Sequence, residues 1–202
     1  MRLVVATRNR GKLAEFRSLL GAHRGLELLC LSDLPPLPEV VEDGDTFLAN
    51  AQKKAREVAL ATRLPTLADD SGLLVDALDG APGVHSARFA GEHASDDENN
   101  TRLLELLANV PTEDRRARFR CVLALATPDG TLGPHTEGEC EGRIVREPRG
   151  AHGFGYDPLF EVEGLGRTMA ELSSAEKDDL SHRAVATRRM KDELDRWLAN
   201  YA

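Results

Sequence analysis

The chain has 202 residues, of which 41% are hydrophobic, which is enough apolar material for one large domain or two lobes. Its formal net charge of −8 argues against a broad surface for nucleic acid or membrane. The three cysteines lack CxxC spacing, and no run of about eighteen apolar residues occurs, so we expect reduced thiols, no membrane partner and a cytoplasmic location.

The amino-terminal segment predicts a strand, a polar loop and a helix. Residues 2–6 are apolar and β-rich, and apolar side chains recur at helical spacing over 11–20. The loop between them lies at the start of a helix, where free N–H groups attract anions. Thr7, Asn9 and Lys12 are therefore candidate phosphate ligands. The alternative is that Asn9 only caps the helix and that Lys12 is a solvated charge.

A second helix is predicted over 46–61 by its apolar stripe. Glu42 precedes this helix in an acidic turn and is placed to join a cation site. Asn50 and either Lys53 or Lys54 lie on flanks that can face a ligand. For the two lysines, a solvated helix face is the ordinary alternative.

Two adjacent carboxylates, a hydroxyl and a glycine follow a short strand predicted over 66–68, before another strand near 73–76. A strand that runs into a turn would place Asp69 and Asp70 on opposite faces. One of them could then hold a cation or activate water while the other is tied to the scaffold. The alternative is an ordinary turn, since Asp, Ser and Gly each favour turns.

The remaining elements predict a mixed α/β fold. They are a strand at 26–31, a helix at 97–108, a strand at 117–126, its hairpin partner near 135–145 and a final helix after Ser174. Apolar residues alternate along the strand at 117–126, which predicts an antiparallel portion in the second half of the sheet.

Two further segments could contact a flat, polar ligand. Residues 153–158 are rich in glycine, which lets backbone approach a ligand, and Phe154 could stack on a ring. The alternative is a glycine-rich turn with this aromatic in the core. Residues 181–183 (Ser-His-Arg) stand near Lys177 at the start of the last helix, where capping and surface charge are the ordinary interpretation.

Taken in this order, these segments resemble the inosine triphosphate pyrophosphatase family, specifically its bacterial dITP/XTP members, nearly from end to end. The segments that carry the resemblance are 7–12, 42–47, 68–73, 80–88, 153–158 and 181–183. One departure is Ala49, where the family has a Glu. This puts in doubt a supporting role for that carboxylate, and leaves the main resemblance in place.

The resemblance implies an α/β fold with a mixed central sheet and flanking helices. It implies one domain over 1–202, with two lobes around a nucleotide-binding cleft, and a homodimer. The implied reaction is Mg²⁺-dependent hydrolysis of purine nucleoside triphosphates (dITP, ITP and XTP) to monophosphate and pyrophosphate, which removes them from the nucleotide pool. Glu42 and Asp70 would hold the metal, and Asp70 would also be the general base. The residues implied to bind substrate are Thr7, Arg8, Asn9, Arg10, Gly11, Lys12, Ser71, Phe154, Gly155, Tyr156, Asp157, Lys177, His182 and Arg183.

Elementary chemistry agrees with this division of roles. A triphosphate carries about four negative charges, so carboxylates face it only with a hard divalent cation between them. A 6-oxo purine presents an acceptor where adenine presents an amino donor, so donors such as Arg183 and His182 would reject ATP. Two other classes stay open: a hydrolase of modified pyrimidine nucleotides, which would lack this base recognition, and a nucleotide sensor without turnover.

Overall fold

The computed structural model describes residues 2–21 and 25–199, and the chain divides into two compact units. Unit 1 consists of residues 1–70, 121–138 and 183–202, and unit 2 consists of residues 71–120 and 139–182. The chain therefore passes between the units four times. Each unit is built from segments that are far apart in the sequence.

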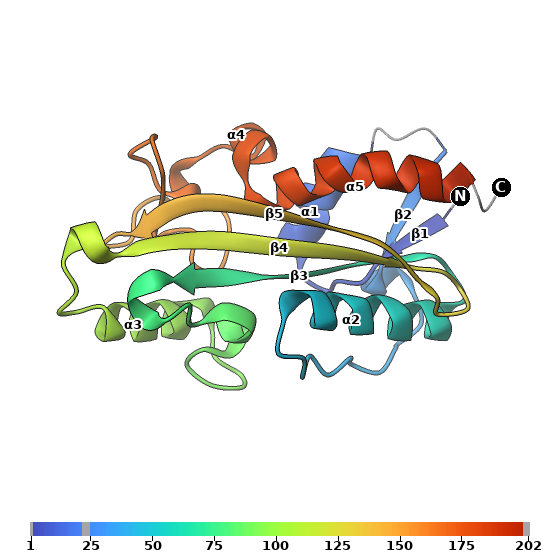
Figure 1. Cartoon of the computed structure of the whole chain (residues 1–202), viewed down its shortest axis with the longest axis horizontal. Coiled ribbons are helices and arrows are strands. Elements are labelled where there is room, and N and C mark those ends of the chain that lie inside the picture. The colour runs from blue at the N-terminus through green and yellow to red at the C-terminus, as the bar shows by residue number, and fades with distance from the viewer. Residues whose placement is uncertain (1, 22–24, 200–202) are drawn as a thin grey trace. The chain divides into compact units, whose positions relative to one another are not determined.

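The strands form a six-stranded sheet in the order β2-β1-β3-β4-β5-β6 (Figure 1). They are β1 (Arg2–Val5), β2 (Glu27–Cys30), β3 (Thr66–Val75), β4 (Arg116–Ala126), β5 (Leu132–Ile144) and β6 (Phe160–Val162). Strand β1 pairs in parallel with β2 and β3, whereas β5 and β6 are antiparallel. The predicted mixed α/β fold and its antiparallel portion are confirmed.

The helices are α1 (Arg10–Leu20), α2 (Phe47–Thr62), α3 (Asp96–Leu106), α4 (Ser174–Leu180) and α5 (His182–Ala199). The predicted single helix after Ser174 is wrong in one respect, because it is interrupted at Ser181. This residue is extended, with φ −65° and ψ 153°, and its N–H closes the end of α4 by donating to the Lys177 carbonyl. The three-residue strand β6 was not predicted, since it is too short to display a period.

The turn predicted at the two aspartates is also wrong. Strand β3 runs without interruption through all ten residues from Thr66 to Val75. It lies between β1 and β4 in the sheet. Pairing with neighbouring strands outweighs the local preference of Asp, Ser and Gly for a turn, because strand formation depends on its tertiary context. Consequently Asp69 and Asp70 belong to a rigid strand.

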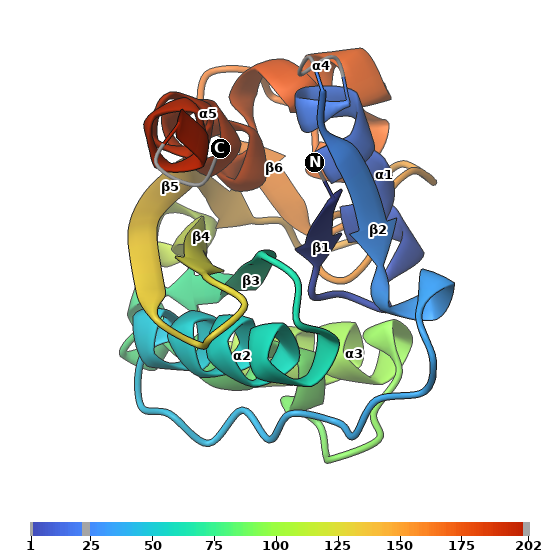
Figure 2. The same ribbon diagram turned by 90° about the vertical axis from the view of Figure 1, so that its right-hand side faces the viewer.

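The core of unit 1 lies between the sheet and two helices, α1 and α5. Its buried members are Leu3, Val5, Phe16, Leu20, Leu67, Cys121, Leu123, Leu125, Ala186, Met190 and Leu194. Helix α2 covers the opposite face of these strands (Figure 2). Side chains alternate along a strand, so Asp69 points to the same face as Leu67, toward α1 and α5. Asp70 points to the face that α2 covers.

Unit 2 has its own core around the other halves of the long strands. It contains Leu73, Val75, Leu103, Leu107, Ala117, Phe119, Cys140, Ile144, Tyr156, Leu159, Phe160, Val162, Met169 and Leu172. This core joins α3 to the segment that precedes α4. Among the described helices, none is long and apolar enough to cross a membrane.

Candidate active site

The loop after β1 lies beside the aspartates of β3. Strand β1 ends where Val5 pairs with Leu67, whereas its parallel neighbour β3 continues. The Asn9 side chain caps α1 by accepting the Lys12 N–H at 3.0 Å, and Thr7 Oγ1 accepts the Asn9 N–H at 3.1 Å. The predicted capping role of Asn9 is thus present, and it fixes the loop at the positive end of the α1 dipole.

The other loop residues lie on the outside of this turn. Arg8 is exposed, and its guanidinium donates to the Leu37 carbonyl at 2.9 Å. Arg10 begins α1 and is exposed, and Gly11 follows it half-buried. The segment predicted to bind phosphate therefore combines helix N–H groups with basic side chains that solvent reaches.

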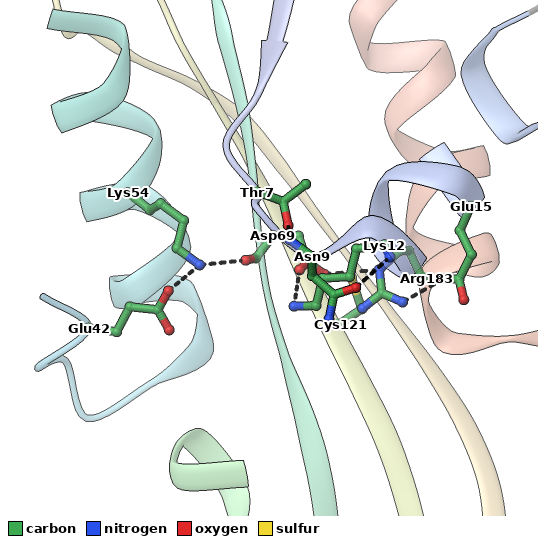
Figure 3. A network of polar contacts seen from close by, with 9 residues as sticks. All are labelled: Thr7, Asn9, Lys12, Glu15, Glu42, Lys54, Asp69, Cys121 and Arg183. Atoms are coloured by element: carbon green, nitrogen blue, oxygen red, sulfur yellow. Dashed lines mark hydrogen bonds and ion pairs between the residues drawn. The ribbon is translucent and has the colours of Figure 1, made fainter. Parts of the chain in front are cut away.

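Asp69 is the centre of a buried ionic network (Figure 3). Its Oδ1 contacts the Lys12 ammonium, and its Oδ2 accepts from Arg183 Nε at 3.2 Å and from Cys121 Sγ at 3.3 Å. Lys54 donates to its backbone carbonyl at 2.9 Å. Burial acts to raise the pKa of Asp69, but the charges of Arg183, Lys12 and Lys54 outweigh it and hold the pKa far below its ordinary value. Asp69 is therefore ionised at neutral pH, and both of its carboxylate oxygens have partners.

Arg183 belongs to this same network. Its side chain is 1% exposed, and its Nη1 donates to Glu15 Oε2 at 2.6 Å while its Nε reaches Asp69. Burial opposes the charge, but the two carboxylates raise the pKa of Arg183 above its ordinary value. The structure thus brings Arg183 together with Lys12 in unit 1. The direct contact with a base, suggested by the sequence, stays a prediction.

Asp70, the next residue, differs from Asp69 in its partners and in the direction of its pKa shift. It is 5% exposed, and its Oδ2 has no hydrogen-bond partner among the residues that the structure describes. Burial, together with the negative charge of Glu42, raises the pKa of Asp70 to about 6. A buried carboxylate with a pKa near neutrality and an open oxygen is suited to accept a proton.

Glu42 lies close enough to Asp70 for its charge to raise the pKa of that carboxyl, and it stands beside Lys54 of α2 (Figure 3). Its carboxylate forms an ion pair with Lys54. Asn50 is fully buried, and its Oδ1 accepts the Gly44 N–H at 2.8 Å, which fixes the turn that carries Glu42. A Cβ at Gly44 would lie 2.8 Å from Asn50 Oδ1, so this turn requires glycine. Ala49 is exposed beside it.

Glu42 and Asp70 fit the requirements of a magnesium ion. Both are carboxylates, the hard oxygen ligands that Mg²⁺ prefers. Asp70 Oδ2 has no hydrogen-bond partner among the described residues, and burial together with the charge of Glu42 raises the pKa of this carboxyl. A cation at this position would offset both effects. Within the described ranges, no group of three or more His, Cys, Asp or Glu side chains could hold a metal. Protein-bound Mg²⁺ commonly completes its coordination with water and substrate phosphates.

A second polar cluster, in unit 2, is built around the glycine-rich segment. Asp157 Oδ2 accepts from Lys177 Nζ at 2.6 Å and from the Phe154 N–H at 3.2 Å. The Asp157 and Lys177 side chains are both less than 10% exposed. Gly153 has φ +88°, and a Cβ there would overlap both the carboxylate and the ammonium. Glycine at this position lets the loop close over a buried ion pair.

The aromatic residues near this cluster differ in their roles. Tyr156 is buried in the unit 2 core and donates its hydroxyl to the Ser86 carbonyl at 2.8 Å. Phe154 is half-buried. His182 stacks on Phe119 with ring centroids 4.8 Å apart and an interplanar angle of 18°. The imidazole plane is thereby set by β4. Ser71 of β3 also belongs to unit 2 and is half-buried.

Sequence reasoning did not single out Lys54 from Lys53. The structure separates them, since Lys53 pairs with Asp43 at the surface whereas Lys54 is turned toward Glu42 and Asp69. Lys54 lies seven residues after Phe47 and therefore on the buried stripe of α2 itself. That spacing could have identified it.

Comparisons with known proteins agree in sequence and in structure. A model of the Ham1 family matches residues 3–193. The dITP/XTP pyrophosphatases of Geobacter sulfurreducens and Shouchella clausii are 55% and 51% identical over 193 residues, which cover 96% of this chain and 96% of each relative. A HAM1 protein structure from Coxiella burnetii matches with a TM-score of 0.87 and 42% identity, over 97% of this chain and 99% of that one. For a nucleoside-triphosphatase (dITP/XTP pyrophosphatase) from Mycobacterium abscessus, the TM-score is 0.75 and the identity 47%, over 94% and 98% of the two chains.

Proposed function

The chain belongs to the Ham1 family, and we propose that it hydrolyses dITP, ITP and XTP to the nucleoside monophosphate and pyrophosphate. The observation that carries the proposal is Asp70, a buried carboxylate with an unsatisfied oxygen among the described residues and a pKa raised to about 6. Its neighbour Asp69 contacts Lys12 of the basic loop at the start of α1, and an anion-binding helix start close to a general base suits the hydrolysis of a phosphoric anhydride.

Glu42 and Asp70 are the residues that would hold Mg²⁺. When bound, the ion would neutralise phosphate charge and polarise a phosphoryl oxygen. Both carboxylates are fixed before substrate arrives, Glu42 by Lys54 and the Asn50 turn, and Asp70 by strand β3. Such preorganisation supports the assignment, because catalytic groups act best from rigid elements.

The phosphates are bound by residues 7–12, through the N–H groups at the start of α1 and the basic side chains. Lys12 supports this role, because its side chain is 19% exposed and Asp69 holds it close to the loop. An ammonium and a helix amino terminus together offset much of the negative charge of a triphosphate. Thr7 and Asn9 act by holding the loop in shape.

Asp70 takes the proton of the attacking water. A P–O bond forms to the water oxygen, and the anhydride bond between the α- and β-phosphates breaks, so that pyrophosphate leaves. The proton from water passes to Asp70 Oδ2, which has no hydrogen-bond partner among the described residues. A pKa of about 6 leaves Asp70 largely ionised at neutral pH and able to act as a general base.

Base recognition is assigned to unit 2, through Ser71, the segment 154–157, Lys177 and His182. Lys177 and His182 supply donors for a 6-oxo acceptor, and such donors disfavour the amino group of adenine. Arg183 is also assigned to substrate binding. Its burial against Asp69 and Glu15 supports an indirect contribution, in which it holds Asp69 and thereby Lys12.

Pyrophosphate release from ITP, dITP, XTP, GTP, ATP and modified pyrimidine triphosphates, with and without Mg²⁺, tests the function. We expect Mg²⁺-dependent turnover of the first three and roughly a hundredfold lower kcat/KM for ATP. Equal turnover of ATP and ITP would overturn the base assignment, preference for pyrimidines would indicate the other hydrolase class, and binding without turnover would indicate a sensor. Homodimer formation and a cytoplasmic location stay predictions, and sedimentation velocity checks the first.

A further inference from the structure

Both backbone polar groups of Gly155 are bound by side chains of α3. The Gly155 N–H donates to Asp96 Oδ2 at 2.6 Å, and its carbonyl accepts from Asn100 Nδ2 at 3.0 Å. Asp96 and Asn100 are four residues apart, so they lie on one face of the first turns of the helix. Gly155 has φ +61°, a conformation that glycine adopts without strain. Helix α3 therefore holds the segment 153–157 by hydrogen bonds to the backbone of its middle residue.

The start of α3 is itself firmly anchored. Ser95 and Glu98 form a capping box, with a Glu98 N–H to Ser95 Oγ bond of 3.3 Å and a Ser95 N–H to Glu98 Oε2 bond of 2.7 Å. Asn99 is buried, accepts the Ala90 N–H at 2.8 Å and donates to the Ala87 carbonyl at 3.2 Å. These bonds make the helix start a fixed support for the Gly155 peptide.

The segment 153–157 also holds the groups that are assigned to recognition of the substrate base. Asp157 Oδ2 binds both the Phe154 N–H and the Lys177 ammonium. A shift of the Gly155 peptide would move its neighbour Phe154 and, through the N–H bond of Phe154, the Asp157 carboxylate. The position of the Lys177 ammonium therefore depends on contacts made by α3.

We propose that Asp96 and Asn100 are positioning residues for base recognition, which act by holding the Gly155 peptide. They touch no substrate in this scheme. The inference rests on the proposed function in one respect, namely that residues 154–157 and Lys177 bind the base. The competing explanation for Asp96 is electrostatic, because any carboxylate in the first turn of a helix interacts favourably with the helix dipole.

Four variants of the full chain separate these explanations: Asp96→Ala, Asp96→Asn, Asn100→Ala and Asp97→Ala. Asp96→Ala removes the acceptor, whereas Asp96→Asn keeps an acceptor oxygen and removes only the charge. Asp97 is exposed in the same helical turn, and its replacement removes the same charge. The two readouts are the hydrogen-exchange rate of the Gly155 amide, followed by NMR, and the kinetics for ITP and ATP.

We expect Asp96→Ala to speed exchange of the Gly155 amide by about tenfold or more and to raise KM for ITP by a similar factor, as for loss of a charge-assisted hydrogen bond. The kcat for ITP should change by less than about threefold, since Asp70 is untouched. Asn100→Ala should raise KM in the same direction, Asp96→Asn should recover most of the loss, and Asp97→Ala should match the wild type.

An equal loss in Asp97→Ala, or no recovery in Asp96→Asn, would show that charge alone matters and would overturn the proposal. Unchanged KM with faster amide exchange would also overturn the proposal, because the hydrogen bonds of Asp96 and Asn100 to Gly155 would then have no effect on base recognition. Should Asp96→Ala not fold, Asn100→Ala tests the same peptide from its carbonyl side. If the wild type does not hydrolyse ITP, the proposed function fails. The exchange rate of the Gly155 amide would still report whether Asp96 and Asn100 hold this peptide in place.

Discussion

Asp69 and Asp70 are consecutive on β3, yet their carboxylates lie on opposite faces of the strand and their pKa values are shifted in opposite directions. Asp69 faces cations from α1 and α5, and Asp70 faces Glu42 on the α2 side. Two chemically identical side chains thereby acquire different roles. The first holds the ionic network of unit 1 and the second is free to take a proton.

Replacement of Asp70 by Asn should abolish most activity. The variant keeps the shape of the side chain but removes the general base, so kcat for ITP should fall by about two to four orders of magnitude. Pyrophosphate release at saturating Mg²⁺ measures this, with circular dichroism as the control for folding. Near-normal kcat in the folded variant would contradict the catalytic assignment.

Activity should also fall on the acid side of neutrality. Asp70 must be ionised to accept a proton, and its pKa without bound metal is about 6, so kcat/KM at limiting Mg²⁺ should decline as pH falls through this value. Saturating Mg²⁺, held by Glu42 and Asp70, should move the decline to lower pH, because a nearby cation favours the ionised carboxylate. Glu42→Gln removes a neighbouring negative charge and should lower the pKa of Asp70. Carbon-13 NMR titration of the Asp70 carboxyl without Mg²⁺ measures that pKa directly. A titration of Asp70 near 4 in the wild type would contradict the expected profile.

The same Asp70→Asn substitution should stabilise the fold. A pKa raised from 3.8 to about 6 means that the folded state binds this proton more tightly than the unfolded state does. The contribution of Asp70 to stability is therefore full below about pH 4 and is lost as pH rises through about 6. At pH 8, Asp70→Asn should raise the free energy of unfolding by about 2 to 3 kcal/mol, and this gain should vanish at pH 4.

Denaturant unfolding at both pH values, with EDTA present, checks the sign as well as the size. Asp69→Asn is the matched comparison and should lower the free energy of unfolding. Asp69→Asn leaves the buried charges of Arg183 and Lys12 without their carboxylate, so we expect a loss of about 3 to 5 kcal/mol. Equal effects of the two substitutions on stability would contradict the division of roles between these neighbours.

Much of this arrangement was predictable because it is local in the chain. The capping of α1 by Asn9 and the apolar stripe of α2 follow from neighbours within one or two turns. The continuity of β3 through Asp69 was not predictable, because it depends on strands β1 and β4 that arrive from distant segments. Local turn preference was real but weaker than sheet pairing.

The ionic partners of Asp69 were hidden for the same reason. Arg183 is 114 residues away in sequence, and the Ser-His-Arg segment indicates a basic site without indicating which acid it meets. Glu15 lies on a helix whose sequence pattern does not indicate an ionic partner, and that partner, Arg183, is 168 residues away. Pairings of this kind follow from topology, which the spacing of residues does not encode.

Replacement of Lys12 should weaken the hydrolysis of every nucleotide alike. Phosphates are common to all substrates, so Lys12→Ala should lower kcat/KM for ITP, XTP, GTP and ATP by similar factors and leave their ratios nearly unchanged. Lys53→Ala is the matched control, because this lysine pairs with Asp43 at the surface. It should retain wild-type kinetics.

Arg183→Ala should follow the pattern of Lys12→Ala. Its guanidinium is 1% exposed and lies against Asp69 and Glu15. Loss of Arg183 should therefore displace Asp69 and with it Lys12, which binds the phosphates of every nucleotide. We expect kcat/KM to fall by about tenfold to a hundredfold for ITP and ATP alike, the range for loss of a hydrogen-bonded charge. The measurement is kcat/KM for the four nucleotides after circular dichroism confirms folding. A loss confined to ITP and XTP would instead mean that Arg183 leaves Asp69 to donate to the 6-oxo group of the base, as the sequence first suggested.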